Sequence, residues 1–233
     1  MNKEHLSIIP VIDELNIIRG VITFDDVIRI MQDLASEDIY TMVGTAKVDP
    51  FAKKITSKIF ARAPWLLITF IGGLFSAFIL NQFQTSLNEF ATIIFFIPFV
   101  LGIAGNVGLQ GSTVIVRGLA TGDIQDDNII RVVKSELMVG ILNGFIFGIL
   151  CGAVVFFIAE ELLQSTPLLG IVVGTGIILA VSISSLIGST TPILFLKSNI
   201  DPAISAGPFI TITNDIAGIT VYLLTASFIY SLL

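Results

Sequence analysis

Charge is scarce in this sequence. Only 13% of its 233 residues are Asp, Glu, Lys or Arg, while 54% are hydrophobic, and the mean hydropathy is +0.95. Soluble domains contain about 25% charged residues. The composition therefore excludes an ordinary soluble domain and favours the lipid bilayer as the surroundings of this chain. No nucleic-acid partner is expected.

Sulfur ligands and catalytic motifs are scarce as well. The one cysteine, Cys151, lies in an apolar run, so an intrachain disulfide is impossible and the thiol is expected to be a packing residue. The sequence contains no GxxxxGK[ST] run and no HExxH run, which argues against an ATPase and an intramembrane hydrolase. We expect that the chain is not an enzyme. The charged start, MNKEHLSIIPVIDE, lacks the apolar core of a cleaved signal peptide.

Long uncharged runs predict five membrane spans. A helix needs about 20 apolar residues to cross about 30 Å of hydrocarbon. The run between Glu161 and Lys197 counts as one span after a turn in STPLLG, and Gly207-Pro208 is the break before the last one. The predicted spans are 63–86, 90–117, 135–159, 168–196 and 208–232. The predicted fold class is an all-α integral membrane protein with a short α/β fragment at its start.

The basic residues predict how these spans are oriented. In a five-span chain all 12 Lys and Arg residues fall on one side of the membrane. The opposite connections, QFQTSLNE and EELLQST, contain none. Because cytoplasmic loops retain Lys and Arg, we expect a multi-pass protein of the plasma (inner) membrane with a cytoplasmic N-terminus and an external C-terminus.

The residues before the membrane domain at 63–233 divide into two segments. Residues 1–32 predict a strand at 6–13, a second strand at 21–24 and a helix with Asp25 as its N-cap. Two strands in fewer than about 40 residues rarely fold alone, so this segment is expected to pack on another copy or on the membrane domain, unless it is a vestigial end. Residues 33–62 predict a polar connecting helix, a break near 48–50 and a basic amphipathic helix at the membrane surface.

Asp215 is the residue that hydrocarbon should exclude. It lies about seven residues into the last span, where a carboxylate costs several kcal/mol unless water, a cation or a partner receives it. A structural ion pair with Arg117 or Lys134 is the alternative to a functional role. The residues expected on the same helix face, at spacings of three and four, are Thr211, Gly218 and Tyr222.

Two further spans show regular patterns. The polar and small residues of the second span, which are expected to face away from lipid, are Gly102, Asn106, Gln110, Thr113 and Arg117. Hydrogen bonds between helices would explain Gln110 and Thr113 equally well. Glu136 is expected to open the third span, where an acidic residue also simply favours a helix N-terminus. The residues of a predicted close-packing seam are Gly140, Gly144, Gly148 and Gly152.

The polar groups within the spans favour a hard cation. They are carboxylate, amide and hydroxyl oxygens, which suit Mg²⁺ and similar ions. Mg²⁺ gives up water reluctantly, so a sparse site with one acidic residue per chain suits it. Two chains on a two-fold axis would bring two Asp215 carboxylates together and offset a divalent charge, which predicts a homodimer.

Three stretches resemble the MgtE family of magnesium channels and transporters. They are GIAGNVGLQGSTVIVRGLATGDI at 102–124, KSELMVGILNGFIFG in the third span and DPAISAGPFITITNDIAG leading into the fifth. The resemblance extends from about residue 8 to the C-terminus. It implies a homodimer with the pore on its axis and hydrated Mg²⁺ bound by Asp215. It also implies pore-lining positions at Asn106, Thr211 and Asn214, and a cytoplasmic pore mouth at Asp201 and Glu136.

The first residues resemble the closing half of a CBS motif. MgtE proteins usually contain an acidic helical domain and two CBS motifs, followed by a connecting helix that plugs the pore when Mg²⁺ bridges acidic surfaces. Here the first domain is missing and the CBS motif is partial. Asp26, Glu37 and Asp38, in FDDV and SEDI, match acidic positions of that bridging and are candidates for regulatory Mg²⁺. Whether intracellular Mg²⁺ closes this chain stays open.

These observations predict channel-like uptake of hydrated Mg²⁺, or of Mn²⁺, Co²⁺ or other divalent cations, in a lipid bilayer. The driving force would be the membrane potential, about 2.3 kcal/mol per charge for each 100 mV. The alternative is a secondary transporter that couples divalent cations to H⁺ or Na⁺. A membrane anchor that oligomerises a sensor module would leave Asp215 unexplained.

Overall fold

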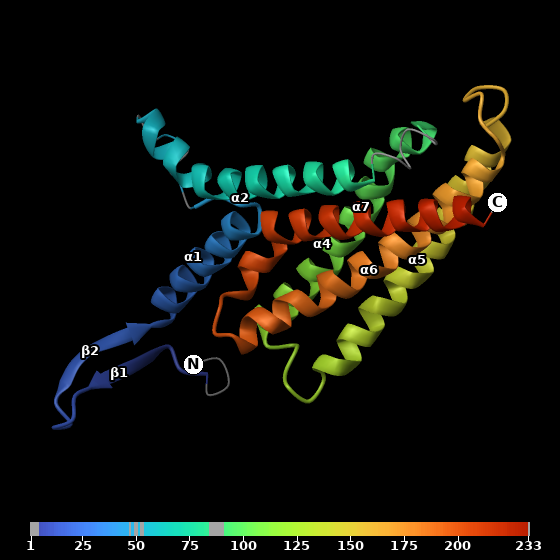
Figure 1. The fold of residues 1–233 in the computed structure, drawn as a ribbon. Helices are drawn as coiled ribbons and strands as arrows, with labels where there is room; N and C mark the ends of the chain where they lie inside the picture. Colours follow the sequence, from blue (N-terminus) through green and yellow to red (C-terminus); the bar gives the residue numbers. More distant parts are fainter. Residues whose placement is uncertain (1–4, 47, 49–50, 52–53, 84–90, 233) are drawn as a thin grey trace.

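Five long helices form the body of the protein. A computed structural model describes residues 5–46, 48, 51, 54–83 and 91–232. The helices are α2 (Ile55–Gln82), α4 (Ile97–Thr121), α5 (Ile129–Ile158), α6 (Leu168–Lys197) and α7 (Pro208–Ser231), and each is long and apolar enough to cross a membrane. The five predicted spans are thereby confirmed (Figure 1).

Proline and glycine mark where several of these helices begin and end. Pro208 occupies the first turn of α7, where the missing N–H costs nothing. Gly122 follows α4 in the left-handed region at φ 76°, which glycine adopts without steric cost. Two short 3₁₀ helices, η1 (Ala91–Phe96) and η2 (Pro202–Ala206), precede α4 and α7. The predicted break at 48–50 and most of the QFQTSLNE connection lie outside the described residues.

Helix α6 forms the centre of the bundle. It contacts α4, α5 and α7, and its side chains Val172, Val173 and Ile177 are fully buried in the main apolar core. The hydroxyl of Tyr222 in α7 donates a hydrogen bond of 3.0 Å to the carbonyl of Ile93, so the start of the η1–α4 unit is tied to the core.

Small residues set the distance between α5 and α6. A Cβ at Gly148 would lie 2.7 Å from the carbonyl oxygen of Gly174, and one at Gly152 would lie 2.8 Å from that of Gly170. Larger side chains would force the two backbones apart. The predicted glycine seam is therefore confirmed, and its partner is α6.

Helix α2 lies at the edge of the bundle. Gly72 is its one buried residue, and it contacts α7. Pro64 lies inside the helix, and Figure 1 shows the first turns of α2 bent away from the rest of it, as expected where a ring replaces a backbone N–H. The helix continues across the expected boundary at 62/63.

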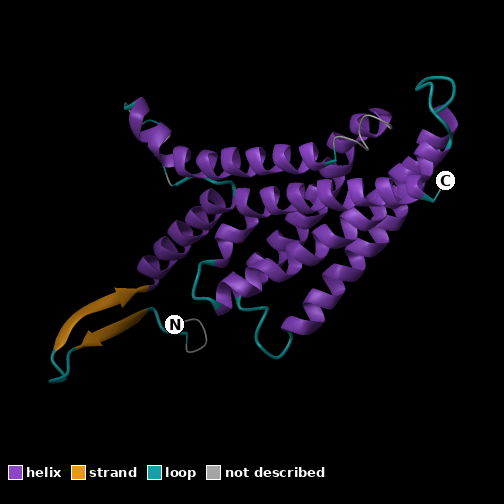
Figure 2. Ribbon diagram, viewed as in Figure 1, coloured by secondary structure: helices purple, strands orange, loops and turns teal. Residues whose placement is uncertain are grey.

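The N-terminal part is a hairpin followed by a helix. Strands β1 (Ile8–Ile12) and β2 (Ile18–Thr23) are antiparallel, and α1 (Phe24–Met42) runs unbroken across the expected boundary at 32/33. Figure 2 shows the hairpin projecting beyond the bundle. No residue of these three elements is buried, which agrees with a segment that needs a further surface to pack on.

The N-cap expected at Asp25 is wrong. Thr23 occupies that position, and its Oγ1 accepts a hydrogen bond of 3.2 Å from the backbone N–H of Asp26. The carboxylate of Asp26 accepts from the N–H of Thr23 in return, which forms a capping box. Because Asp26 supplies the second half of the box, Thr23 is the residue that can satisfy both ends.

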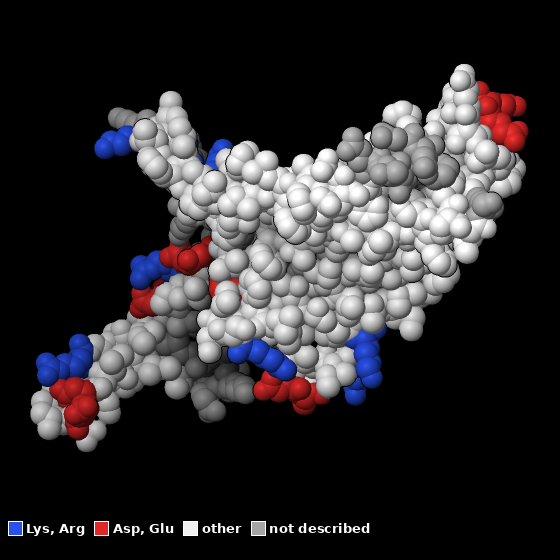
Figure 3. Space-filling view, in the orientation of Figure 1, with Lys and Arg blue, Asp and Glu red and all other residues white. Residues whose placement is uncertain are grey.

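Charge is distributed unevenly along the bundle. In Figure 3 a belt without charged side chains separates the end near the hairpin and the α4–α5 connection from the opposite end, where the loop after α5 lies. Lys and Arg appear at the first end, and the loop at the other end contains Glu160 and Glu161. The belt is the surface that hydrocarbon would cover.

Candidate cation-binding site

A cavity of about 360 Å³ lies among α1, α2, α4 and α7. Asp215 and Thr211, one helical turn apart on α7, both line it. The remaining two residues of the predicted α7 face lie elsewhere, because Gly218 and Tyr222 are buried. The face is therefore divided along its length, with its first half open to the cavity and its second half in the core.

Asp215 has no protein partner in the described part of the chain. The ion pairs found there are Arg19 with Asp13 and Arg29 with Asp26, and no hydrogen bond reaches the Asp215 carboxylate. The structural alternative, pairing with Arg117 or Lys134, is therefore not what this fold contains. A half-buried carboxylate facing a cavity at this depth needs water or a cation.

The wall opposite Asp215 comes from α2. Thr69, Gly72, Gly73 and Ser76 line the cavity, and they recur on one face at spacings of three and four. Sequence reasoning missed this stripe because α2 contains no charge within its span to draw attention to it. The spacing of small and hydroxyl residues was the available signal.

The cavity is covered on the side of α1. Met42 and Val43, at the end of that helix, line it together with Gly207 and Pro208. Met42 also packs on a buried cluster that contains Val116. The end of the segment expected to act as a connecting helix therefore lies directly over the cavity.

Asn214 does not line the cavity. Its side chain is 1% exposed and lies against Gly108 of α4 and Ser184 of α6, and neither polar atom of its amide has a hydrogen-bond partner. Adjacent residues of a helix point about 100° apart. The fold uses this angle to place the Asp215 carboxylate in the cavity and the Asn214 amide between helices.

Asn106 lies on the surface of the single chain. The residues of the predicted α4 stripe that are exposed are Gly102, Asn106, Gln110 and Arg117. From α4 it is Leu109 that reaches the cavity. An amide stripe at the depth of a membrane span would meet hydrocarbon unless another surface covers it.

Glu136 lies at a different junction. Helix α5 begins at Ile129, so Glu136 is two turns inside the helix and the expectation that it opens the span is wrong. Its Oε2 would lie 3.7 Å from a Cβ at Gly111 of α4, and its carbonyl accepts a hydrogen bond of 3.0 Å from the Ser185 hydroxyl. The structure does not bring it to the cavity that Asp215 lines.

Comparison with known proteins agrees with the residues of this site. The family model of MgtE, described as a divalent cation transporter, matches residues 97–225, which is more than half of the chain. The chain belongs to the MgtE family. The matched region runs from α4 to α7 and includes Asp215, whereas the α1 and α2 walls of the cavity lie outside it.

Three MgtE relatives are similar over nearly the whole chain. The magnesium transporter MgtE of Bacillus subtilis is 33% identical over 225 residues, which are 96% of this chain and 49% of the relative. The proteins of the same name from Enterococcus faecalis and Thermus thermophilus are 32% and 31% identical over 94% of this chain and 47% and 48% of their own lengths. The chain thus spans about half the length of these MgtE relatives.

Two of the acidic residues expected from the MgtE resemblance meet at one place. Asp38 of α1 and Asp201, which precedes η2, line a second cavity of about 190 Å³. Burial, and next the carboxylates of Asp201 and Glu37, raise the pKa of Asp38, while Arg117 acts in the opposite direction. One Asp201 oxygen also caps η2 by accepting a hydrogen bond of 2.9 Å from Ala203. This arrangement places two like charges across the junction of α1 and the membrane helices.

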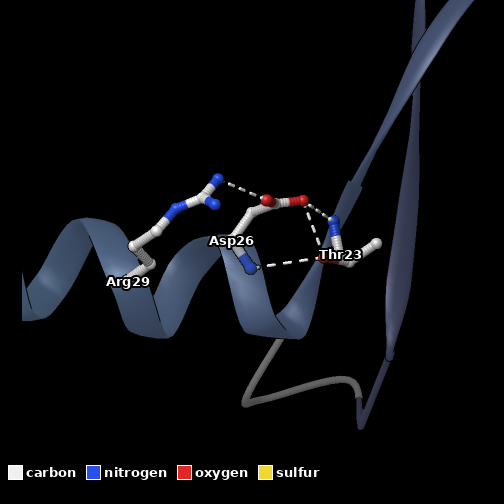
Figure 4. A network of polar contacts seen from close by, with 3 residues as sticks. All are labelled: Thr23, Asp26 and Arg29. Carbon is white, nitrogen blue, oxygen red and sulfur yellow. Dashed lines mark hydrogen bonds and ion pairs between the residues drawn. The ribbon is translucent and has the colours of Figure 1, made fainter.

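The third MgtE-type acidic position, Asp26, is separate. One carboxylate oxygen accepts hydrogen bonds from the backbone and the hydroxyl of Thr23, and the other bonds to Arg29 at 2.8 Å (Figure 4). These partners, the Thr23 hydroxyl foremost, lower the pKa of Asp26. The 12 residues of helix between Asp26 and Asp38 correspond to about 18 Å. Asp26 is thus occupied within α1 and does not join the Asp38–Asp201 pair.

Proposed function

We propose that this chain forms a homodimeric, channel-like pathway for hydrated Mg²⁺ across the membrane, with Asp215 as the residue that binds the ion. The proposal extends the family membership to an activity, an ion and an assembly. Mn²⁺, Co²⁺ and other divalent cations present the same hard charge to the site and are competing ions. The enrichment of Lys and Arg at the N-terminal end supports a cytoplasmic N-terminus.

The observation that carries the proposal is the unpaired Asp215 carboxylate in a cavity of about 360 Å³. Six waters around Mg²⁺ occupy about 180 Å³ at about 30 Å³ each. The cavity therefore has room for the ion with its water, and the hydroxyls of Thr211, Thr69 and Ser76 lie in the same wall. Contacts through water suit an ion that dehydrates reluctantly.

The exposed stripe on α4 supports a dimer. Asn106 and Gln110 are exposed in the single chain, and a second copy would remove these amides from hydrocarbon. A two-fold axis near the stripe would also join the two cavities, so that two Asp215 carboxylates offset the charge of one divalent ion. Asn106 would then line the shared pathway. Asn214 would support α7 from behind.

A second cation between Asp38 and Asp201 would regulate the pathway. The two carboxylates line one cavity, and their repulsion, which contributes to the raised pKa of Asp38, would be removed by a divalent ion. Such an ion would hold α1 over the Asp215 cavity and oppose conduction. Glu37 is exposed next to this pair and would add charge, whereas Glu136 and Asp26 would not contribute.

Uptake into liposomes tests the pathway. The chain is reconstituted in parallel with Asp215→Asn and with the control Asp127→Asn, which removes an exposed carboxyl in the α4–α5 loop. We expect Asp215→Asn to abolish or make unselective the Mg²⁺ flux measured with an internal fluorescent indicator, and the control to leave it unchanged. Equal and selective flux in the Asp215 variant would refute the site.

The same liposomes separate a channel from a coupled transporter. Flux that follows an imposed potassium diffusion potential, without dependence on a pH or Na⁺ gradient, is the expected result for a channel. Flux that requires a proton or Na⁺ gradient would support coupling instead. Chemical cross-linking through Cys residues placed at Asn106 and Gln110 tests the dimer, because a two-fold interface brings each residue near its own copy.

A further inference from the structure

The start of α2 is a cationic surface without opposing charge. Lys54, Lys58 and Arg62 recur every four residues, which places them along one side of the helix. From Lys54 to the end of α2 the sequence contains no Asp or Glu. Lys54 and Arg62 are exposed. This side of the helix therefore presents positive charge alone.

The other side of the same turns is apolar and uncovered. Ile55 is 74% exposed and Phe60 is 76% exposed, and Ile59 lies one turn after Ile55. Pro64 bends the helix after these turns, so they do not continue along the axis of the membrane-spanning part (Figure 1). A short helix with a basic side and an apolar side, set at an angle to a span, matches the water–hydrocarbon boundary.

A groove begins a short distance further along α2. It lies between α2 and α7 and has a volume of about 290 Å³. The residues that line it are chiefly Ile68, Ile71, Phe75, Phe209, Ile212 and Ile216. The one hydroxyl among the lining residues, that of Thr213, already donates a hydrogen bond of 2.8 Å to the carbonyl of Phe209. The groove thus offers hydrocarbon surface and asks for no polar partner.

The groove and the cationic turns fit the dimensions of one lipid leaflet. Six residues of helix, about 9 Å, separate Arg62 from Ile68, and the groove extends along α2 to Phe75, about 10 Å further. The hydrocarbon of one leaflet is about 15 Å thick, half of the bilayer core. Phe209, in the first turn of α7, lies at the same end of the bundle.

We propose that the cationic turns at the start of α2 and the α2–α7 groove together bind an anionic phospholipid of the leaflet on the N-terminal side. The phosphate-bearing headgroup lies at Lys54, Lys58 and Arg62, and an acyl chain occupies the groove. Charge complementarity selects an anionic over a zwitterionic headgroup, because three cations face it without an acidic residue on the helix. The apolar lining accepts the chain of either lipid.

The bound lipid would adjoin the ion site. Gly72 and Ile212 line both the lipid groove and the Asp215 cavity, and these two residues are in direct contact. They form the partition between the two spaces. An acyl chain in the groove would hold α2 against α7 and so maintain the α2 wall of the cavity.

Native mass spectrometry of the detergent-solubilised chain tests this inference. The chain is titrated with phosphatidylglycerol or with phosphatidylcholine, and the bound lipid is counted from its mass. We expect tighter binding of phosphatidylglycerol, and the triple variant Lys54→Gln, Lys58→Gln, Arg62→Gln should lose this preference by about fivefold for each cation removed. Thr213→Trp, which fills the groove, should reduce the binding of both lipids equally.

A matched triple variant supplies the control. Arg131→Gln, Lys134→Gln, Lys197→Gln removes three exposed cations from the same end of the bundle and should leave the preference intact. Equal loss in this control, or full preference in the α2 variant, would overturn the proposal, because the charge effect would then be general or absent. A change from dimer to monomer on Thr213→Trp would also overturn it, since the groove would then hold a second copy of the chain.

Discussion

Gly44 lies directly against Pro208, the first residue of the helix that contains Asp215. A Cβ at Gly44 would overlap the Cγ of the proline ring and would lie 2.7 Å from its Cδ. Gly44 also has φ 76°, a conformation that other L-residues rarely adopt. The turn after α1 is therefore held to the start of α7 by a contact that only glycine permits.

Gly44→Ala should release the end of α1 from the cavity. Two effects act together, the left-handed backbone and the overlap with Pro208, so we expect Met42, replaced by Cys in a Cys151→Ser background, to react faster with a water-soluble thiol reagent. Gly122→Ala is the control, because Gly122 has the same φ of 76° but nothing within 4 Å of its Cβ position. Equal reactivity of the cysteine at position 42 in the two variants would show that the contact with Pro208 does not hold α1.

Gly108→Ala should destabilise the bundle. Its Cβ would overlap the Asn214 amide and lie 2.9 Å from the carbonyl oxygen of Ser184, and overpacking of this kind costs about 1–3 kcal/mol. Thermal unfolding in detergent, followed by circular dichroism, should show a lower midpoint. Gly105→Ala on the same helix, where nothing lies within 4 Å, should be neutral or stabilising, because alanine favours helix. The prediction fails if both variants melt alike.

Ser76→Leu should reduce Mg²⁺ flux without touching Asp215. Ser76 lines the cavity from α2, and a leucine there would fill space that a hydrated ion needs. Ala77→Leu is the control, since Ala77 is exposed and does not line the cavity. Liposome uptake should fall by about tenfold or more in the first variant and stay near its original rate in the second, a tenfold change corresponding to about 1.4 kcal/mol. Similar rates would place the ion elsewhere.

The docking of α1 should strengthen as the pH falls. Burial and the neighbouring Asp201 raise the pKa of Asp38 in the docked state above its ordinary value of 3.8, so the docked state binds this proton more tightly than the undocked one. Docking stability is therefore greatest below the ordinary pKa and decreases as the pH rises through the raised pKa. Hydrogen exchange of α1 amides, corrected for the intrinsic rate, should slow on acidification.

Asp38→Asn should remove this pH dependence, and added Mg²⁺ should slow the same amides in the original chain at neutral pH. Asp25→Asn, on the exposed first turn of α1, is the matched control and should retain both responses. If Mg²⁺ slows α1 exchange equally in the Asp38 variant, the cation does not bind between Asp38 and Asp201.

Much of the membrane fold could be predicted from local sequence. The start of α6 at Leu168 and of α7 at Pro208 coincide with the expected spans, because uncharged runs of this length have few ways to satisfy their backbone in lipid except as helices. The start of α5 was placed too late. Its first turns contain Arg131 and Lys134, which hydropathy assigns to a loop, yet a helix extends into the headgroup region without cost to exposed cations.

Which residues meet was a different matter. Hydropathy, charge and glycine spacing are properties of the chain in order, and they determined by themselves the five helices, the family and the importance of an acidic residue in the last span. The tertiary structure alone decided that Asp215 faces a cavity while Asn214 is buried against Gly108, and that Asp38 reaches Asp201. The reason is physical: the rotation of each helix about its axis is chosen by close contacts between small residues of different helices, and those contacts join positions far apart in the sequence.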